Sequence, residues 1–387
     1  LERNDARIAV SVRTFGAVEG FPLWSGRFEC DVSGILALAD TVSAGIADAL
    51  AVARPQALDP RADDPRVAEL VMRARQSYHL FWHPHAARAL ALFEEALAIA
   101  PEHPGALSGC CLAALRVSLF TSDGLAAARR AAERAAEIAP DASEVRVAEA
   151  AVAMQDGDVA TAVTKAKRAV LASPELGEAQ AQLGRILIEA DLLTEGTRHL
   201  EWALALEPDL WLARWDLTRA HALTGNWDVV DRLDEGMHIN GVGRWLDRAR
   251  YALWRRDRAG AKAHLAALPD DVGPGPIALA RAVLEIVAGE NTQATASTFE
   301  LFNRQGAASP RQRAFVAQIE AEIAAFQGRR ADALAAIVSA ADAGLTDLAW
   351  LMRCPLLEGH RTSPTFGVVV RHVGAIAARV REALYEE

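Results

Sequence analysis

The sequence has 387 residues, of which 51% are hydrophobic, and its formal net charge at pH 7 is -10. That length and apolar content argue against a disordered chain and leave room for more than one domain with a sizeable core. The acidic balance argues against a general nucleic-acid-binding protein, because binding to phosphates depends largely on Lys and Arg.

The first fifty residues have the pattern of strands rather than helices. RIAVSVRTF alternates in polarity and is rich in β-branched residues, and FPLWSGRFE follows a Glu19-Gly20 turn. A cap at Asp31 then predicts an amphipathic helix over about 34 to 53. Such a small β-β-α segment encloses too little core to stand alone. Its exposed strand edge, Ile8 to Phe15, makes a homodimer one expectation.

A phrase that ends in proline recurs along the following part of the chain. The prolines are Pro101, Pro140, Pro174 and Pro208, and the second and third intervals between them are equal, while the first is slightly longer. Small residues stand twelve positions before them (Ala89, Ala128, Ala162 and Gly196) and alanines stand five positions before them (Ala96, Ala135, Ala169 and Ala203). Small side chains let two helices approach closely, and proline ends the second helix of each unit.

The columns resemble the tetratricopeptide (TPR) repeat, whose helix-turn-helix unit has the same length as the two equal proline intervals. We therefore predict a mostly α fold, a TPR-type α-solenoid of helix hairpins preceded by the small N-terminal β-β-α segment. Gly157 and Gly225, two periods apart, are predicted to form turns between paired helices. The array is expected over 66–345, regular over 66–208 and degenerate over 209–345.

Both ends of the chain carry a further resemblance. LWSGRFECDVSGILALADTVSAGIADAL resembles the end of a TolB-like α/β domain, which would make 1–55 a partial domain of that type. The tail WLMRCPLLEGHRTSPTFGVVVRHV resembles the segment that closes such arrays, so 346–387 is expected to be a helical cap. The resemblance implies the regulatory region of a bacterial signalling protein, such as a Ser/Thr kinase, a class III nucleotide cyclase or a winged-helix regulator. Because the first residue is Leu1, we expect a fragment whose effector domain lies upstream.

Sequence motifs for catalysis are not found. The chain has no P-loop, no G-x-G-x-x-G, no nucleophile elbow and no H-E-x-x-H pattern. His79, His83 and His85 come closest to a metal site, but no Asp, Glu or Cys stands at ligand spacing, so a polar turn is favoured. We predict no metal, no cofactor, no catalytic residue and no enzyme.

Cysteine usage and hydropathy bear on the compartment. Cys30, Cys110, Cys111 and Cys354 form neither a C-x-x-C pair nor a zinc-ligand spacing, so a reducing compartment is the simpler interpretation. No run of about 18 apolar residues predicts a membrane span. A cytoplasmic protein is expected, or a periplasmic one if the full chain has an upstream span.

An arginine column gives the candidate binding site. Arg185 recurs one period later as Arg219, and in the shortened next repeat as Arg250. This column lies on the first helix of each pair, and Trp215 and Trp254 are expected close to it. Arg and aromatic residues are common at binding hot spots, so we predict a groove for an acidic, partly apolar peptide. The alternative is that the tryptophans fill the core and each Arg pairs with a nearby Glu or Asp.

Three functions follow in order of preference. A non-catalytic scaffold that holds a protein or peptide partner explains the repeats best. A sensor for a small molecule or signal peptide is second, supported by the six of nine tryptophans that fall between Trp202 and Trp254. A hydrolytic enzyme is third, because no nucleophile can be paired with a base.

Overall fold

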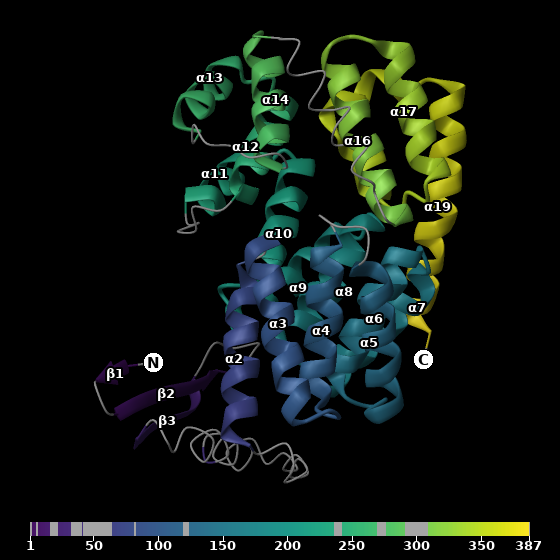
Figure 1. Cartoon of the computed structure of the whole chain (residues 1–387). Coiled ribbons are helices and arrows are strands. Elements are labelled where there is room, and N and C mark those ends of the chain that lie inside the picture. Colours follow the sequence, from purple (N-terminus) through teal and green to yellow (C-terminus); the bar gives the residue numbers. More distant parts are fainter. Residues whose placement is uncertain are drawn as a thin grey trace. The chain divides into compact units, whose positions relative to one another are not determined.

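The computed structural model describes residues 2–4, 7–15, 22–31, 41, 64–80, 83–118, 124–235, 242–268, 276–290 and 309–386 (Figure 1). The chain divides into two compact units, Leu1–Ala68 and Glu69–Glu387.

The first unit contains a small antiparallel sheet in the order β1-β2-β3. Its strands are β1 (Glu2–Asn4), β2 (Arg7–Phe15) and β3 (Pro22–Asp31). Strands β2 and β3 coincide with the two strands expected from the sequence, and β1 is an additional strand that pairs with β2. The helix expected over 34–53 lies outside the described residues, so the β-β-α segment as a whole stays a prediction.

Helices make up the described part of the remaining chain. The helices that follow the sheet are α2 (Pro65–His79), α3 (His83–Ile99), α4 (Pro104–Val117), α5 (Gly124–Ile138), α6 (Ser143–Asp156), α7 (Val159–Ala172), α8 (Gly177–Glu189), α9 (Leu193–Leu206), α10 (Trp211–Leu223), α11 (Trp227–Glu235), α12 (Val242–Arg255), α13 (Arg258–Ala267) and α14 (Pro276–Ala288). The C-terminal elements are α16 (Pro310–Phe326), α17 (Arg330–Asp342), α18 (Leu348–Arg353), the short 3₁₀ helix η3 (Pro355–His360) and α19 (Pro364–Tyr385).

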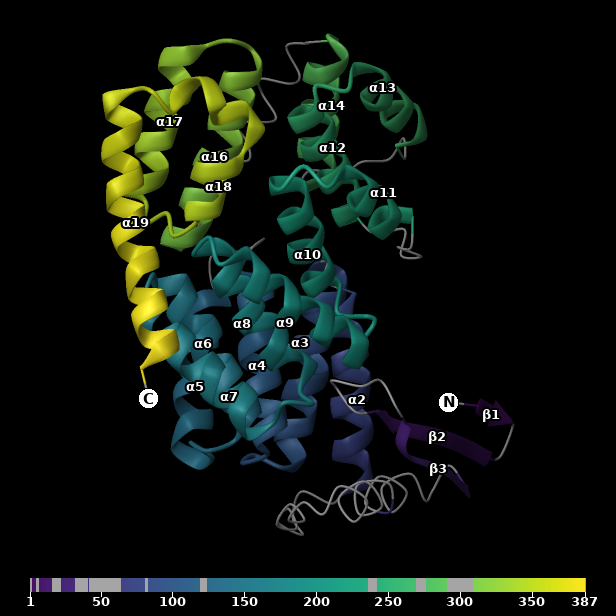
Figure 2. The same cartoon turned by 180° about the vertical axis from the view of Figure 1, so that it is seen from behind.

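The helices pack as successive hairpins. Helix α4 packs on α5, α6 on α7 and α8 on α9, and these pairs appear as neighbouring antiparallel helices in Figure 2. The first helices of consecutive pairs also contact one another, α4 with α6, α6 with α8 and α8 with α10. The second unit is therefore an all-α solenoid, as the repeat period predicts.

The small-residue columns lie at the contacts between helices. Both alanine columns are fully buried, with 0% exposure at Ala89, Ala128, Ala162, Ala96, Ala135, Ala169 and Ala203. A Cβ added to Gly196 would lie 2.8 Å from the Gly184 carbonyl oxygen, so α8 and α9 approach too closely there for a larger side chain. This confirms the prediction that the small residues in these columns let neighbouring helices pack closely.

Left-handed backbone marks the turns inside the hairpins. Gly157 between α6 and α7 has a φ of 79°, and Gly225 between α10 and α11 has a φ of 74°. Glycine favours this conformation because it has no Cβ to clash with the following carbonyl. Asp191 stands one repeat period after Gly157 and keeps the same geometry with a φ of 63°.

The C-terminal helices fold back onto the repeats. Helix α16 packs on α6 and α12, and α18 packs on α8 and α10. Helix α19 is 22 residues long and returns to α7, where Lys167 Nζ donates a 2.6 Å hydrogen bond to the Glu386 carbonyl oxygen. Both views place α19 beside this part of the array (Figures 1 and 2). The C-terminal segment thus consists of the short helix α18, the 3₁₀ helix η3 and the long helix α19.

Candidate functional site

Arg185, Arg219 and Arg250, here called the arginine ladder, lie on three successive first helices, α8, α10 and α12. Each guanidinium is paired with a carboxylate of this chain. The pairs are Arg185 with Asp216 at 2.7 Å, Arg219 with Asp347 at 2.6 Å and Arg250 with Glu322 at 2.6 Å. The structure therefore brings the three arginines into one polar row, and the carboxylates in that row come from α10, α16 and the start of α18.

The Arg250 pair is the most deeply buried of the three. Glu322 is 0% exposed and accepts hydrogen bonds from Nε and Nη2 of Arg250. Its Oε1 also accepts a 2.7 Å bond from the indole nitrogen of Trp350. Burial would lower the pKa of Arg250, but the Glu322 carboxylate outweighs it and the pKa is raised. The pair is a fixed ion pair inside the packed C-terminal helices.

The two tryptophans predicted to lie near the ladder pack against other side chains of this protein. Trp254 is 3% exposed, and its ring lies 4.9 Å from the Arg250 guanidinium carbon. Trp215 is half-buried and meets Trp211 edge-on with ring centroids 4.6 Å apart. Partner binding by the ladder and these two tryptophans stays a prediction, because every ladder guanidinium already has an internal carboxylate.

Asp247 is the exception in the polar row. The side chain is buried on α12, at 3% exposure, and neither carboxylate oxygen has a hydrogen-bond partner. Burial raises its pKa well above the ordinary value, while Arg250 and Arg219 act in the opposite direction. A buried acid in this state favours its neutral form.

A further ion pair, partly buried, joins α16 to the repeats. Arg311 forms a bidentate pair with Glu189 at the end of α8, and Thr346 Oγ1 donates a 2.9 Å hydrogen bond to the same carboxylate. Burial would raise the pKa of Glu189, but the charge and hydrogen bonds of Arg311 lower it to about 2. The sequence analysis missed this pair, because 122 residues separate its members.

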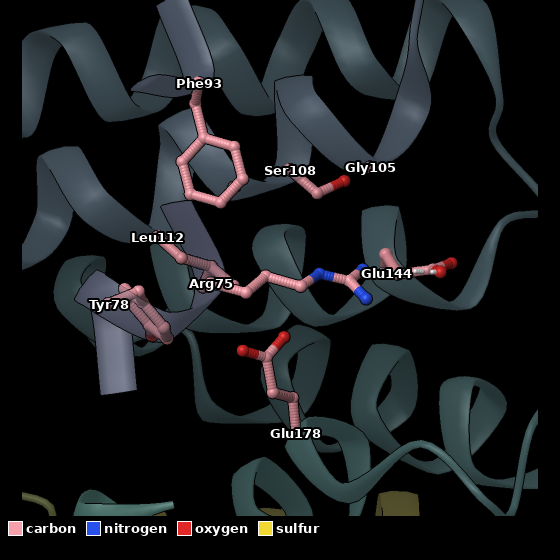
Figure 3. Close-up of a pocket in the computed structure, with 9 residues that line it drawn as sticks. Arg75, Tyr78, Phe93, Gly105, Ser108, Leu112, Glu144 and Glu178 are labelled. Atoms are coloured by element: carbon pink, nitrogen blue, oxygen red, sulfur yellow. Dashed lines mark ion pairs between the residues drawn. The ribbon is translucent and has the colours of Figure 1, made fainter. Parts of the chain in front are cut away.

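A pocket lies among helices α2, α3, α4, α6 and α8 (Figure 3). It is a narrow opening lined by Arg75, Tyr78, Phe93, Gly105, Ser108, Gly109, Leu112, Glu144 and Glu178. Arg75 of α2 extends between Glu144 of α6 and Glu178 of α8. Its Nη2 lies 3.9 Å from Glu144 Oε1, and the two side chains are 42% and 39% exposed. We call this site the Arg75 pocket.

Beside the Arg75 pocket, a histidine lies between two carboxylates. His79 Nε2 is 3.8 Å from Glu178 and 3.7 Å from Glu207. Burial would raise the pKa of Glu178, but the neighbouring His79 and the charge of Arg75 lower it. Burial and the neighbouring Glu178 charge raise the pKa of Glu207. The cluster holds more acid than its bases neutralise.

Arg116 of α4 packs against Tyr78, which lines the Arg75 pocket. Its guanidinium carbon lies 3.6 Å from the centroid of the Tyr78 ring, and its Nη1 donates to the Tyr78 carbonyl oxygen. The sequence analysis missed this residue. Its position, close to two repeat periods before Arg185, was the available signal.

Within the described ranges, no group of three or more His, Cys, Asp or Glu side chains is arranged to hold a metal ion. Across the same ranges, no helix combines the length and apolar character that crossing a membrane requires.

The period, the buried alanine columns and the hairpin packing define an α-solenoid of the TPR type. No family model and no curated protein matches the chain. Among solved structures, it is similar to PilF of Pseudomonas aeruginosa, with 12% identity, 54% of this chain and 92% of that chain covered, and a TM-score of 0.36. A tetratricopeptide repeat protein from Parabacteroides merdae has 14% identity, coverages of 80% and 98%, and a TM-score of 0.32. Yeast Tom70 has 12% identity, coverages of 88% and 78%, and a TM-score of 0.40. At these low scores, the repeat class rests on the packing of this chain itself.

Proposed function

We propose that this chain is a non-catalytic scaffold that holds a segment of a partner protein in the Arg75 pocket. The observation that carries the proposal is the contrast along one face of the solenoid. Arg219 and Arg250 are buried, Arg185 is partly buried, and all three are paired internally, whereas Arg75 and Glu144 are more exposed and lie 3.9 Å apart. A weakly paired, partly hydrated ion pair costs little to rearrange around an incoming side chain.

The pocket suits a basic side chain flanked by an apolar one. Three carboxylates, those of Glu144, Glu178 and Glu207, lie beside Arg75 and His79. An incoming Lys or Arg would take the place of Arg75 between Glu144 and Glu178. The rings of Tyr78 and Phe93 offer the apolar contact.

The groove predicted from the sequence at the arginine ladder is part of this proposal. An acidic segment on Arg185, Arg219 and Arg250 would have to compete with Asp216, Asp347 and Glu322 for their guanidiniums. We further propose that the scaffold belongs to the regulatory region of a bacterial signalling protein, which the TolB-like and TPR resemblance supports. We also propose that the chain divides into 1–55, 66–345 and 346–387. A homodimer that forms through the N-terminal strands is proposed as well.

The test is selection of a displayed random peptide library on the immobilised full chain. We expect enriched peptides to share a basic residue next to an apolar or aromatic one. The double variant Glu144→Gln, Glu178→Gln should weaken binding of the enriched peptide at least tenfold. Glu201→Gln, an exposed position on α9, is the matched control and should bind as the wild type does. Peptides without a shared motif, or equal binding by the double variant, would contradict the proposal.

A further inference from the structure

The ladder contains a repeated pair of residues. Helix α10 carries Asp216 three residues before Arg219, and α12 carries Asp247 three residues before Arg250. The step from Asp216 to Asp247 equals the step from Arg219 to Arg250, so the two motifs occupy the same register. Arg185 reaches forward from α8 to Asp216 on α10. By the same register, Arg219 on α10 has Asp247 on α12 as its counterpart.

Arg219 is bound elsewhere. It donates to Asp347, which lies 128 residues further along the chain and precedes α18. Asp247 is left with neither oxygen hydrogen-bonded, although it is buried and the charges of Arg250 and, more weakly, Arg219 act on it. Buried polar groups without partners are uncommon and carry a free-energy cost, so this one needs an explanation. The explanation we infer is that Asp347 has taken the place of Asp247.

The segment that brings Asp347 is held by several ladder contacts at once. Asp347 Oδ2 accepts from Arg219 and from Gln318, and Oδ1 accepts from the Trp350 backbone at 3.0 Å. The Trp350 indole donates to Glu322, which Arg250 holds. An acid followed three residues later by Trp therefore fits Arg219 and Arg250 together. This is the acidic, partly apolar chemistry expected for a ligand of the ladder.

We propose that the site formed by Arg219 and Arg250, which the C-terminal helices bury in this structure, is a docking site for an acidic helical segment of the form Asp-x-x-Trp. In this structure the chain's own segment, Asp347–Leu351, occupies it. A partner segment with the same two residues competes for the site. Asp247 is the reserve partner that pairs with Arg219 whenever the site is empty, so that exchange never leaves that buried guanidinium without a carboxylate.

This inference concerns a different surface from the Arg75 pocket, and either can fail without the other. Its variants lie on α12 and α18, whereas those that test the pocket lie on α6 and α8.

The first experiment is a double-mutant cycle in the full chain, with the thermal unfolding midpoint as the readout. Asp247→Asn should raise the midpoint in the wild type, because the buried carboxyl there has no partner. In an Asp347→Asn background, where Arg219 pairs with Asp247, the same substitution should lower the midpoint. A reversal of sign shows that Asp247 pairs with Arg219 when Asp347 is removed, and it excludes a buried acid that never pairs with Arg219. An equal shift in both backgrounds would overturn the proposal.

The second experiment measures binding of a fluorescent peptide with the sequence of residues 343–361, carrying Cys354→Ser. The full-length double variant Asp347→Ala, Trp350→Ala should bind it at least tenfold more tightly than the wild type, in which the site is filled. A control peptide with Ala in place of both key residues should not bind either protein. If the double variant retains its helical circular dichroism and still binds no better than the wild type, the docking site does not exist.

Should the double variant fail to fold, hydrogen exchange in the wild type decides. The proposal requires the amides of α18 to exchange faster than those of α8, since the segment leaves its site without global unfolding. Equal protection of α18 and α8 means that the segment is permanent core and overturns the proposal.

Discussion

The three ladder arginines occupy equivalent repeat positions and differ in the carboxylates with which they pair. The period places Arg185, Arg219 and Arg250 in one register, and the structure keeps them in one row. Removing one member of a buried pair leaves a charge that neither water nor protein solvates, which is why such pairs are fixed. Asp247, in the same row without a partner, is therefore the most unusual residue of the face.

Asp247→Asn gives a prediction at this scale. Because burial raises the pKa of Asp247 above its ordinary 3.8, the folded state binds more protons than the unfolded one and loses stability as pH rises from 3.8 through the folded pKa. The substitution removes this loss. We expect the free energy of unfolding at pH 7 to rise by about 1 kcal/mol.

Urea titrations at pH 7 and at pH 3.5 check this prediction. The gain from Asp247→Asn should fade at the lower pH, where the wild-type carboxyl is protonated in the folded state and mostly protonated in the unfolded state. A gain of equal size at both values of pH would show that ionisation of Asp247 is not the cause.

At the scale of elements, the hairpins depend on two local devices, small residues between helices and left-handed turns. The alanine columns are fully buried over four consecutive repeats, and Gly157 and Gly225 take positive φ where the sequence places their turns. Both devices act through excluded volume near the backbone. That is why spacing alone located them.

Ala203→Leu tests the packing columns. The Ala203 side chain is fully buried on α9, so three extra carbons have no space and should lower the free energy of unfolding by about 2 kcal/mol. Ala205→Leu on the same helix is exposed and is the matched control, expected within about 0.5 kcal/mol of the wild type. Chemical denaturation measures both. Similar effects at the two sites would contradict the assigned helix contact.

Gly157→Ala tests the turns. No atom lies within 4 Å of the added Cβ, so the only cost is the left-handed backbone, about 1 kcal/mol. Gly374→Ala is the counterpart inside helix α19, where the Cβ also has open space and alanine is the better helix former. We expect it to raise the free energy of unfolding by about 0.5 to 1 kcal/mol. A stabilising Gly157→Ala would argue against the strained turn.

At the scale of the whole second unit, the C-terminal helices are held on the repeats by ion pairs as well as by apolar contact. One buried apolar cluster extends from Ala150 in α6 to Val380 in α19. Glu189 with Arg311, and Arg219 with Asp347, join first helices of the repeats to α16 and to the start of α18. The C-terminal helices thereby cover part of the surface that the first helices of the repeats form.

Glu189→Gln tests this attachment. The pKa of Glu189 is lowered to about 2 from an ordinary 4.5, so its pairing stabilises the fold above pH 4.5 and is lost as pH falls toward 2. The substitution should lower the free energy of unfolding at pH 7 by about 3 kcal/mol. Urea denaturation at pH 7 and at pH 3 measures it, with Glu201→Gln as the exposed control. The difference from the wild type should shrink at pH 3, and a difference that does not shrink would exclude the ion pair as its source.

The sequence by itself determined the hairpins of this protein, because helix propensity, proline stops and small-residue columns act within a single repeat period. It also found the arginine row, since a register repeats wherever the hairpins repeat. It could not name the acids that occupy that row, because Asp347 is 128 residues from Arg219 and Glu322 is 72 residues from Arg250. It did not single out the Arg75 pocket either, whose lining comes from five helices. Only the tertiary structure decided these pairings, since a buried charge takes whichever opposite charge the packing of distant helices brings within hydrogen-bond distance.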